Sequence, residues 1–169
     1  MILFLILWKL LKHLLFWISL LFINLCGFMS NLFENEELSF KYSNNWKKMD
    51  VDDDLENCLA IFDHKSGYSR VMIVKYPEEG LSLEYLKSAI EDIPRVETLK
   101  CVKSDFIIIG NKESYELIAI DESHEPPLKT RSIACIGGRD AYVFNFMSFG
   151  LENPDEEAFL NIYRTLEFK

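Results

Sequence analysis

The pattern of hydrophobic and polar residues divides the chain into an apolar first part and a mixed remainder. Residues 1–28 contain no acidic residue and no proline, and all 27 acidic residues lie beyond them. Within this part, Leu14–Phe28 is interrupted only by one serine and one asparagine. The residues before this run can lengthen it toward the roughly 20 that a membrane-spanning helix needs. We therefore predict an N-terminal hydrophobic helix over residues 1–28 that anchors the chain in a membrane.

The orientation of this anchor follows from the basic residues that precede the apolar run. Lys9 and Lys12 favour a cytoplasmic N-terminus, which places the rest of the chain outside. Three alternatives remain open. A cleaved signal peptide lacks its small-residue cleavage site, and a lipoprotein signal ending at Cys26 has Leu25 where a small residue is needed. The third is a translation start at Met29, which predicts a cytoplasmic protein without an anchor.

Beyond the anchor we predict a short linker over residues 29–37 and a single domain over residues 38–169, because about 140 residues suffice for one core. Apolar and polar residues alternate over Leu38–Tyr42, which predicts a half-buried strand. The polar stretch Lys47–Asn57 is predicted to be a surface loop. Further strands are predicted over Cys58–Phe62 and Arg70–Tyr76, joined by a hairpin turn at Asp63–Gly67.

Two segments have the spacing of amphipathic helices. After a capping residue, Ser82, apolar residues recur over Leu83–Ile93 at i, i+3, i+7 and i+10, and Pro94 ends the pattern. Near the C-terminus, Asn153 followed by proline is a strong helix start. Apolar residues over Phe159–Leu166 then share one face.

The segment between the two helices predicts four strands, because it is rich in β-branched and aromatic residues. They are expected over Lys100–Ile109, Lys112–Ile120, Thr130–Ile136 and Ala141–Phe149. Tyr142, Phe144 and Phe146 alternate along the last one, and we predict that they belong to the core. The order of elements indicates an α+β fold, with an antiparallel sheet of about six to seven strands and helices packed on it.

Two segments resemble PsbP-like domains. The opening Leu38–Trp46 (LSFKYSNNW) runs from a strand through a tyrosine and a turn to a tryptophan, and the closing Glu157–Phe168 is a phenylalanine-led helix. One departure is Ser43, where the family usually has proline. The resemblance implies an α-β-α sandwich. Named members are adaptors, one an extrinsic subunit of the water-splitting photosystem and another that binds the Ran GTPase. No functional residue of theirs can be matched to this chain, but many uncharacterised members share its anchored layout.

Composition narrows the classes of function. Two of the 18 basic residues lie in the anchor, so 16 basic residues accompany 27 acidic ones in the remainder, a formal charge of −11. This balance argues against nucleic-acid binding, which requires basic patches. Cys58, Cys101 and Cys135 are odd in number and cannot form a complete disulfide framework. We predict that they are buried free thiols.

Candidate chemistry is sparse. His64 and His124 fall in predicted loops beside acidic residues, and we predict that both are exposed. A weak candidate for a divalent cation is an acidic loop without the glycine and glutamate spacing of an EF-hand. It consists of Asp50, Asp52, Asp53, Asp54 and Glu56. A solvated loop is the favoured interpretation, so we predict no metal and no cofactor.

The sequence therefore favours a non-enzymatic, membrane-tethered binding or scaffolding domain. Its expected partner is a protein that engages loops such as residues 50–56 or 122–127. The alternative is a cytosolic adaptor or small-ligand-binding domain starting at Met29, with a pocket lined by Trp46 and the strand aromatics. An enzyme would require His64 or His124 to converge with an acid or a thiol in a cleft.

Overall fold

A computed structural model describes most of the chain beyond its first 29 residues. The described residues are 30–52, 55, 57–76, 82–92, 98–109, 111–151 and 155–169. The predicted anchor over residues 1–28, the alternative start at Met29 and the helix-ending Pro94 lie outside them. Among the described residues, no helix is both long enough and apolar enough to cross a membrane.

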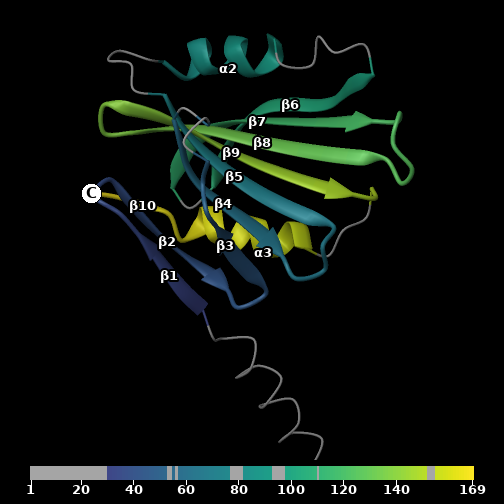
Figure 1. The fold of residues 1–169 in the computed structure, drawn as a ribbon. Helices are drawn as coiled ribbons and strands as arrows, with labels where there is room; N and C mark the ends of the chain where they lie inside the picture. The colour runs from purple at the N-terminus through teal and green to yellow at the C-terminus, as the bar shows by residue number, and fades with distance from the viewer. Residues whose placement is uncertain are drawn as a thin grey trace, which may run out of the picture.

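The centre of the molecule is a seven-stranded antiparallel sheet with the strand order β3-β4-β5-β9-β8-β7-β6 (Figure 1). Its strands are β3 (Trp46–Met49), β4 (Cys58–His64), β5 (Ser69–Tyr76), β6 (Leu99–Ile109), β7 (Lys112–Asp121), β8 (Leu128–Gly137) and β9 (Asp140–Phe149). All of the predicted strands from residue 58 to residue 149 are present. The prediction of a loop from Lys47 is wrong for β3, whose two lysines are exposed at the edge of the sheet.

A second, three-stranded sheet has the order β1-β2-β10 and consists of β1 (Ser30–Glu34), β2 (Leu38–Ser43) and β10 (Glu167–Phe168). The predicted linker over residues 29–37 is thus wrong for β1. The predicted strand at Leu38 is present, but it lies in this small sheet. The reason is a local hairpin: the backbone N–H groups of Glu37 and Leu38 both donate to Asn35 Oδ1, at 2.9 and 2.8 Å.

An ion pair and a close packing contact are among the contacts that join the small sheet to the large one. The ammonium group of Lys75 on β5 donates to Glu37 and lies 3.1 Å from Asp140 Oδ2. These carboxylates, Glu37 foremost, raise the pKa of Lys75 to about 12. On β10, Phe168 packs over Gly137, where a Cβ atom would come within 2.2 Å of its ring. Glycine at this position therefore permits the close approach of the C-terminal strand.

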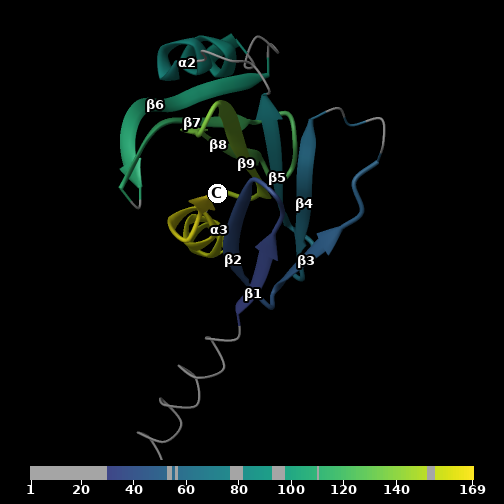
Figure 2. The ribbon, with the colours of Figure 1, turned by 90° about the vertical axis from the view of Figure 1, so that its left-hand side faces the viewer.

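The two helices of the described part of the chain lie on opposite faces of the large sheet (Figures 1 and 2). Helix α2 (Leu83–Asp92) packs on β7 and β8 through Leu86 and Ile90, which are buried. Helix α3 (Asp155–Arg164) packs against β9 and against β2 of the small sheet. The fold is thus mostly antiparallel sheet with few helices.

The larger hydrophobic cluster lies between the main sheet, α3 and the small sheet. Tyr142, Phe144 and Phe146 are buried in it, which confirms the prediction that they are core residues. Phe159 of α3 stacks on Phe146 with ring centroids 5.1 Å apart. Trp46 is buried in the same cluster, so the side chains expected to line a ligand pocket fill the core instead.

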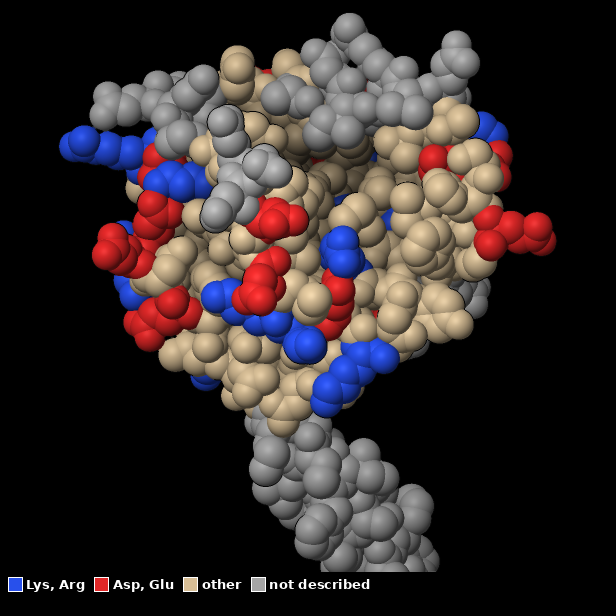
Figure 3. Space-filling model, in the orientation of Figure 1, with Lys and Arg blue, Asp and Glu red and all other residues tan. Residues whose placement is uncertain are grey.

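Charged residues of both signs are interspersed over the face that Figure 3 shows. Many are paired, for example Arg164 with Glu157 and Lys169 with Glu34. No extended basic surface is visible on this face.

Candidate functional site

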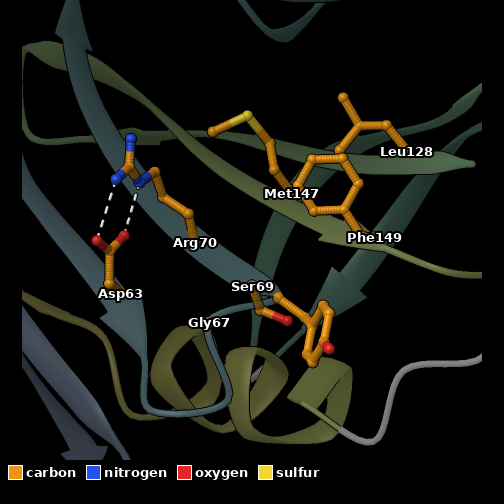
Figure 4. Close-up of a pocket in the computed structure, with 8 residues that line it drawn as sticks. Asp63, Gly67, Ser69, Arg70, Leu128, Met147 and Phe149 are labelled. Carbon is orange, nitrogen blue, oxygen red and sulfur yellow. Dashed lines mark hydrogen bonds and ion pairs between the residues drawn. The ribbon is translucent and has the colours of Figure 1, made fainter. Parts of the chain in front are cut away.

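An open pocket lies where three chain segments meet at one end of the main sheet (Figure 4). Its volume is about 390 Å³. The lining side chains come from the β4–β5 hairpin and from the ends of β8 and β9: Asp63, Gly67, Tyr68, Ser69, Arg70, Leu128, Met147 and Phe149. The pocket lies in the size range of small-molecule sites.

The pocket is mainly apolar, with one charged wall. Arg70 donates from Nε and from one terminal nitrogen to the two carboxylate oxygens of Asp63, at 2.6 and 3.0 Å (Figure 4). This bidentate pair raises the pKa of the guanidinium and fixes its plane. On the apolar side, Tyr68 is 61% exposed and Phe149 is 43% exposed. Large half-exposed aromatics around a concave surface are typical of binding sites.

The backbone holds these aromatic side chains in place. Gly67 has a φ angle of +78°, which other residues rarely adopt, and its N–H donates to the carbonyl of His64 at 3.0 Å. Phe149 N donates to the carbonyl of Tyr68 at 3.0 Å, and Gly150 N donates to that of Pro127 at 2.8 Å. The hairpin, the end of β9 and the loop before β8 are thereby tied together around the pocket.

Beside the pocket, a polar cluster fastens the β4–β5 hairpin to the start of α3. A single carboxylate oxygen, Asp155 Oδ2, accepts from Ser69 Oγ at 2.8 Å and from Ser66 Oγ at 3.0 Å, and lies 3.0 Å from His64 Nδ1. Asp155 is in the first turn of α3, where a negative charge is favoured by the helix dipole. The cluster therefore stabilises the arrangement of the two elements.

The structure corrects the prediction for His64, whose side chain is only 12% exposed and lies at the end of β4. It does converge with an acid and a hydroxyl, as an enzyme would require. In a catalytic triad, however, the acid binds Nδ1 and the nucleophile binds Nε2. Here Ser66 Oγ and Asp155 both contact Nδ1, so the cluster lacks that geometry.

His124 lies in an exposed turn, as predicted, 3.6 Å from Asp121.

The acidic-loop candidates are only partly described. Asp50 and Asp52 are exposed after β3, whereas Asp53, Asp54 and Glu56 lie outside the described residues. In the part of the chain that the structure describes, no three histidine, cysteine or acidic side chains are grouped so that they could hold a metal ion.

The cysteines differ from one another in their surroundings. Cys135 is buried, as predicted, and burial raises the pKa of its thiol to about 11. Cys58 is partly buried, and burial likewise raises the pKa of its thiol. The prediction of burial is wrong for Cys101, which is exposed on β6, a strand that pairs with β7 alone among the described strands. All three are free thiols.

A buried ionic network lies on the α3 face of the sheet. Glu116 on β7 has no exposed surface, and it accepts from Lys103 Nζ at 2.6 Å and from Arg131 Nε at 2.7 Å. Arg131 also donates to Glu156 of α3 at 2.8 Å. Burial alone would raise the pKa of Glu116, but the hydrogen bond from Lys103 and the charge of Arg131 outweigh it and lower the pKa.

Sequence reasoning missed most of the pocket. Tyr68 and Phe149 are adjacent because β5 pairs with β9, with Ser69 opposite Ser148. These positions are far apart in the sequence, and no motif links them. The local signals near the site are the hairpin turn at Asp63–Gly67 and the loop over residues 122–127 that precedes Leu128.

The comparison of structures finds similar proteins, whereas the two comparisons of sequence find none. No family profile matches it, and no curated protein matches it. A crystal structure of a protein from Bacteroides thetaiotaomicron is 13% identical over 78% of this chain, with a TM-score of 0.56, and this chain spans only 45% of that protein.

The solution structure of cyanobacterial PsbP (CyanoP) from Synechocystis is 9% identical to this chain, with a TM-score of 0.58. The match covers 83% of this chain and 92% of CyanoP. Identities this low show a shared fold only. The described part of the chain therefore has a PsbP-like fold, as the resemblance of its first and last segments implied.

Proposed function

We propose that this protein is a non-enzymatic binding or scaffolding domain that engages a protein partner through the pocket and its aromatic rim. The observation that supports the proposal is the open apolar pocket lined by Tyr68, Leu128 and Phe149. Leu151, which is 51% exposed, adds apolar surface beside the end of β9. A protruding aliphatic or aromatic side chain of a partner would bury this surface.

The proposed partner surface includes one of the loops that the sequence singled out. Residues 122–127 lead directly into Leu128, and His124 contacts the ring of Phe149 with centroids 6.1 Å apart. The side chain of Arg70 is about half exposed, so its guanidinium can pair with a carboxylate of the partner while it keeps its contact with Asp63. An apolar anchor beside a charged rim is the usual composition of a specific interface.

The partner can be sought by photocrosslinking in the native membranes of the producing cell. A photoreactive phenylalanine analogue replaces Tyr68 in the full chain, and the control carries it at Tyr85, an equally exposed aromatic on α2. We expect a discrete crosslinked product from Tyr68 only. The double variant Tyr68→Ser/Phe149→Ser should lower recovery of the same partner about tenfold or more. Identical products from both positions, or none from either, would contradict the proposal.

We further propose that residues 1–28 tether the domain to a membrane, with the N-terminus in the cytoplasm and the domain outside. The alternative is a cytoplasmic domain starting at Met29 that binds a small ligand, which the pocket volume of about 390 Å³ favours. Native mass spectrometry of membrane and soluble fractions separates the two. A full-length mass in membranes supports the tether. A mass beginning at Met29 in the soluble fraction, with a bound small molecule that a Phe149→Trp variant loses, supports the alternative.

A further inference from the structure

Strand β6 forms one edge of the seven-stranded sheet, and among the described residues only β7 pairs with it. Figure 2 shows it along the outer margin of the sheet. Seven consecutive residues, Lys100–Phe106, are exposed. A strand in this position presents a row of N–H and C=O groups that can pair with another strand.

Three large apolar side chains of β6 are exposed, between charged ones. Val102 is 61%, Phe106 is 44% and Ile108 is 74% exposed. Edge strands of monomeric proteins are generally short or strongly charged, because long apolar edges associate. β6 has 11 residues, which is long for a strand.

Two copies of β6 have complementary side chains when they pair antiparallel with Ser104 of each copy at the centre. In an antiparallel pair of two copies centred on this residue, Lys103 lies opposite Asp105 and Val102 lies opposite Phe106. Opposite charges and apolar pairs placed directly across from each other both stabilise a sheet. Centring the pair on Lys103 or on Asp105 would instead bring two like charges together on the axis. The charge pattern thus favours the register centred on Ser104 over those centred on Lys103 or Asp105.

We propose that β6 pairs with β6 of a second copy of this chain, antiparallel and about a two-fold axis at Ser104. The two seven-stranded sheets then become one continuous sheet. Such an interface is isologous, so each favourable contact occurs twice.

The contacts around β6 are compatible with this pairing. Lys103 and Asp105 share one face of the strand, since Lys103 is opposite Ile118 and Asp105 is opposite Glu116 on β7. Lys103 donates to Glu116 at 2.6 Å, but half of its side-chain surface remains exposed. The register shift between Cys101 and Lys103 falls at Val102, which is the last residue of the proposed ladder over residues 102–106.

Disulfide trapping of the full chain in the membranes of the producing cell tests the register. In a background with Cys26→Ser and Cys101→Ser, Ser104→Cys places the two new thiols directly opposite each other. We expect mild oxidation to convert this variant to a covalent dimer on a non-reducing gel. The control is Lys47→Cys at the opposite edge of the sheet, where no dimer should form. An equal yield at both positions, or trapping by Phe106→Cys in preference to Ser104→Cys, would overturn the proposal.

A charge reversal tests the same interface without cysteines. In the proposed dimer, Asp105→Lys places a lysine opposite Lys103 of the other copy, and this repulsive pair occurs twice. We therefore expect the detergent-purified full chain with this substitution to dimerise about tenfold more weakly, as measured by light scattering over a concentration series. Glu113→Lys makes the same charge change at an exposed position of β7 and should leave the dimer unchanged. A monomeric wild-type chain at every concentration would refute the pairing.

Discussion

Arg131→Met is expected to lower the free energy of unfolding by about 3–5 kcal/mol at neutral pH. Arg131 donates twice to Glu116, from Nε and from a terminal nitrogen, and Glu116 is completely buried. Methionine fills similar volume but supplies no donor. The carboxylate then keeps Lys103 as a charged partner on Oε2, but its Oε1 loses both donors from Arg131, so a buried charge is left only partly compensated.

Two further variants make this prediction specific. Arg131→Met combined with Glu116→Gln removes the buried charge as well, and it should recover more than half of the lost stability. Arg70→Met breaks an exposed arginine–aspartate pair with comparable geometry and should cost about 1 kcal/mol or less. Urea titrations of the four proteins measure these differences. A cost for Arg131→Met as small as that for Arg70→Met would show that burial of Glu116 is unimportant.

The same variant should change the pH dependence of stability. In the wild type the pKa of Glu116 is lowered in the folded state. The ionised carboxylate therefore contributes to the free energy of unfolding above the ordinary carboxyl pKa, and this contribution is lost as the pH falls through the lower folded pKa. Without Arg131, burial favours the protonated carboxyl. The difference in stability between the two proteins should therefore shrink between pH 7 and about pH 4. A constant difference over this range would contradict the assignment to Glu116.

Phe159→Ala is the second substitution with a large expected effect, a loss of about 3–5 kcal/mol. Its ring is fully buried and stacks on Phe146 at an interplanar angle of 15°, which fastens α3 to the main sheet. Truncation leaves a cavity that the sheet and helix cannot close. For a chain of this length we expect the midpoint of thermal unfolding to fall by about 10 °C.

Conservative and exposed controls accompany Phe159→Ala. Phe159→Leu keeps most of the volume and should cost about 1.5 kcal/mol or less. Tyr85→Ala removes an exposed aromatic on α2 and should change stability by less than about 0.5 kcal/mol. Thermal scans by circular dichroism compare the three. A loss below about 1 kcal/mol for Phe159→Ala would mean that α3 contributes little to the core.

Local patterns predicted most of the elements correctly. Alternation and β-branched residues identify the strands from Cys58 to Phe149, and the 3.6-residue spacing identifies α2 and α3. The failures occur where local sequence is ambiguous. Ser30–Glu34 is too polar to read as a strand, and its one buried residue, Phe33, is held by stacking on Phe40 at 4.8 Å. That stabilisation exists only after the hairpin has formed.

By itself, the sequence determined the α+β class, the aromatic core and the strongly acidic composition beyond residue 28, because these depend on residue type and local periodicity. The tertiary structure alone decided that Leu38–Ser43 belongs to a second sheet, that His64 meets Asp155, and that Tyr68 lies beside Phe149. It also placed β6 at an open edge. Strand order and long-range contacts depend on how whole elements pack, and no local pattern records which strands become neighbours.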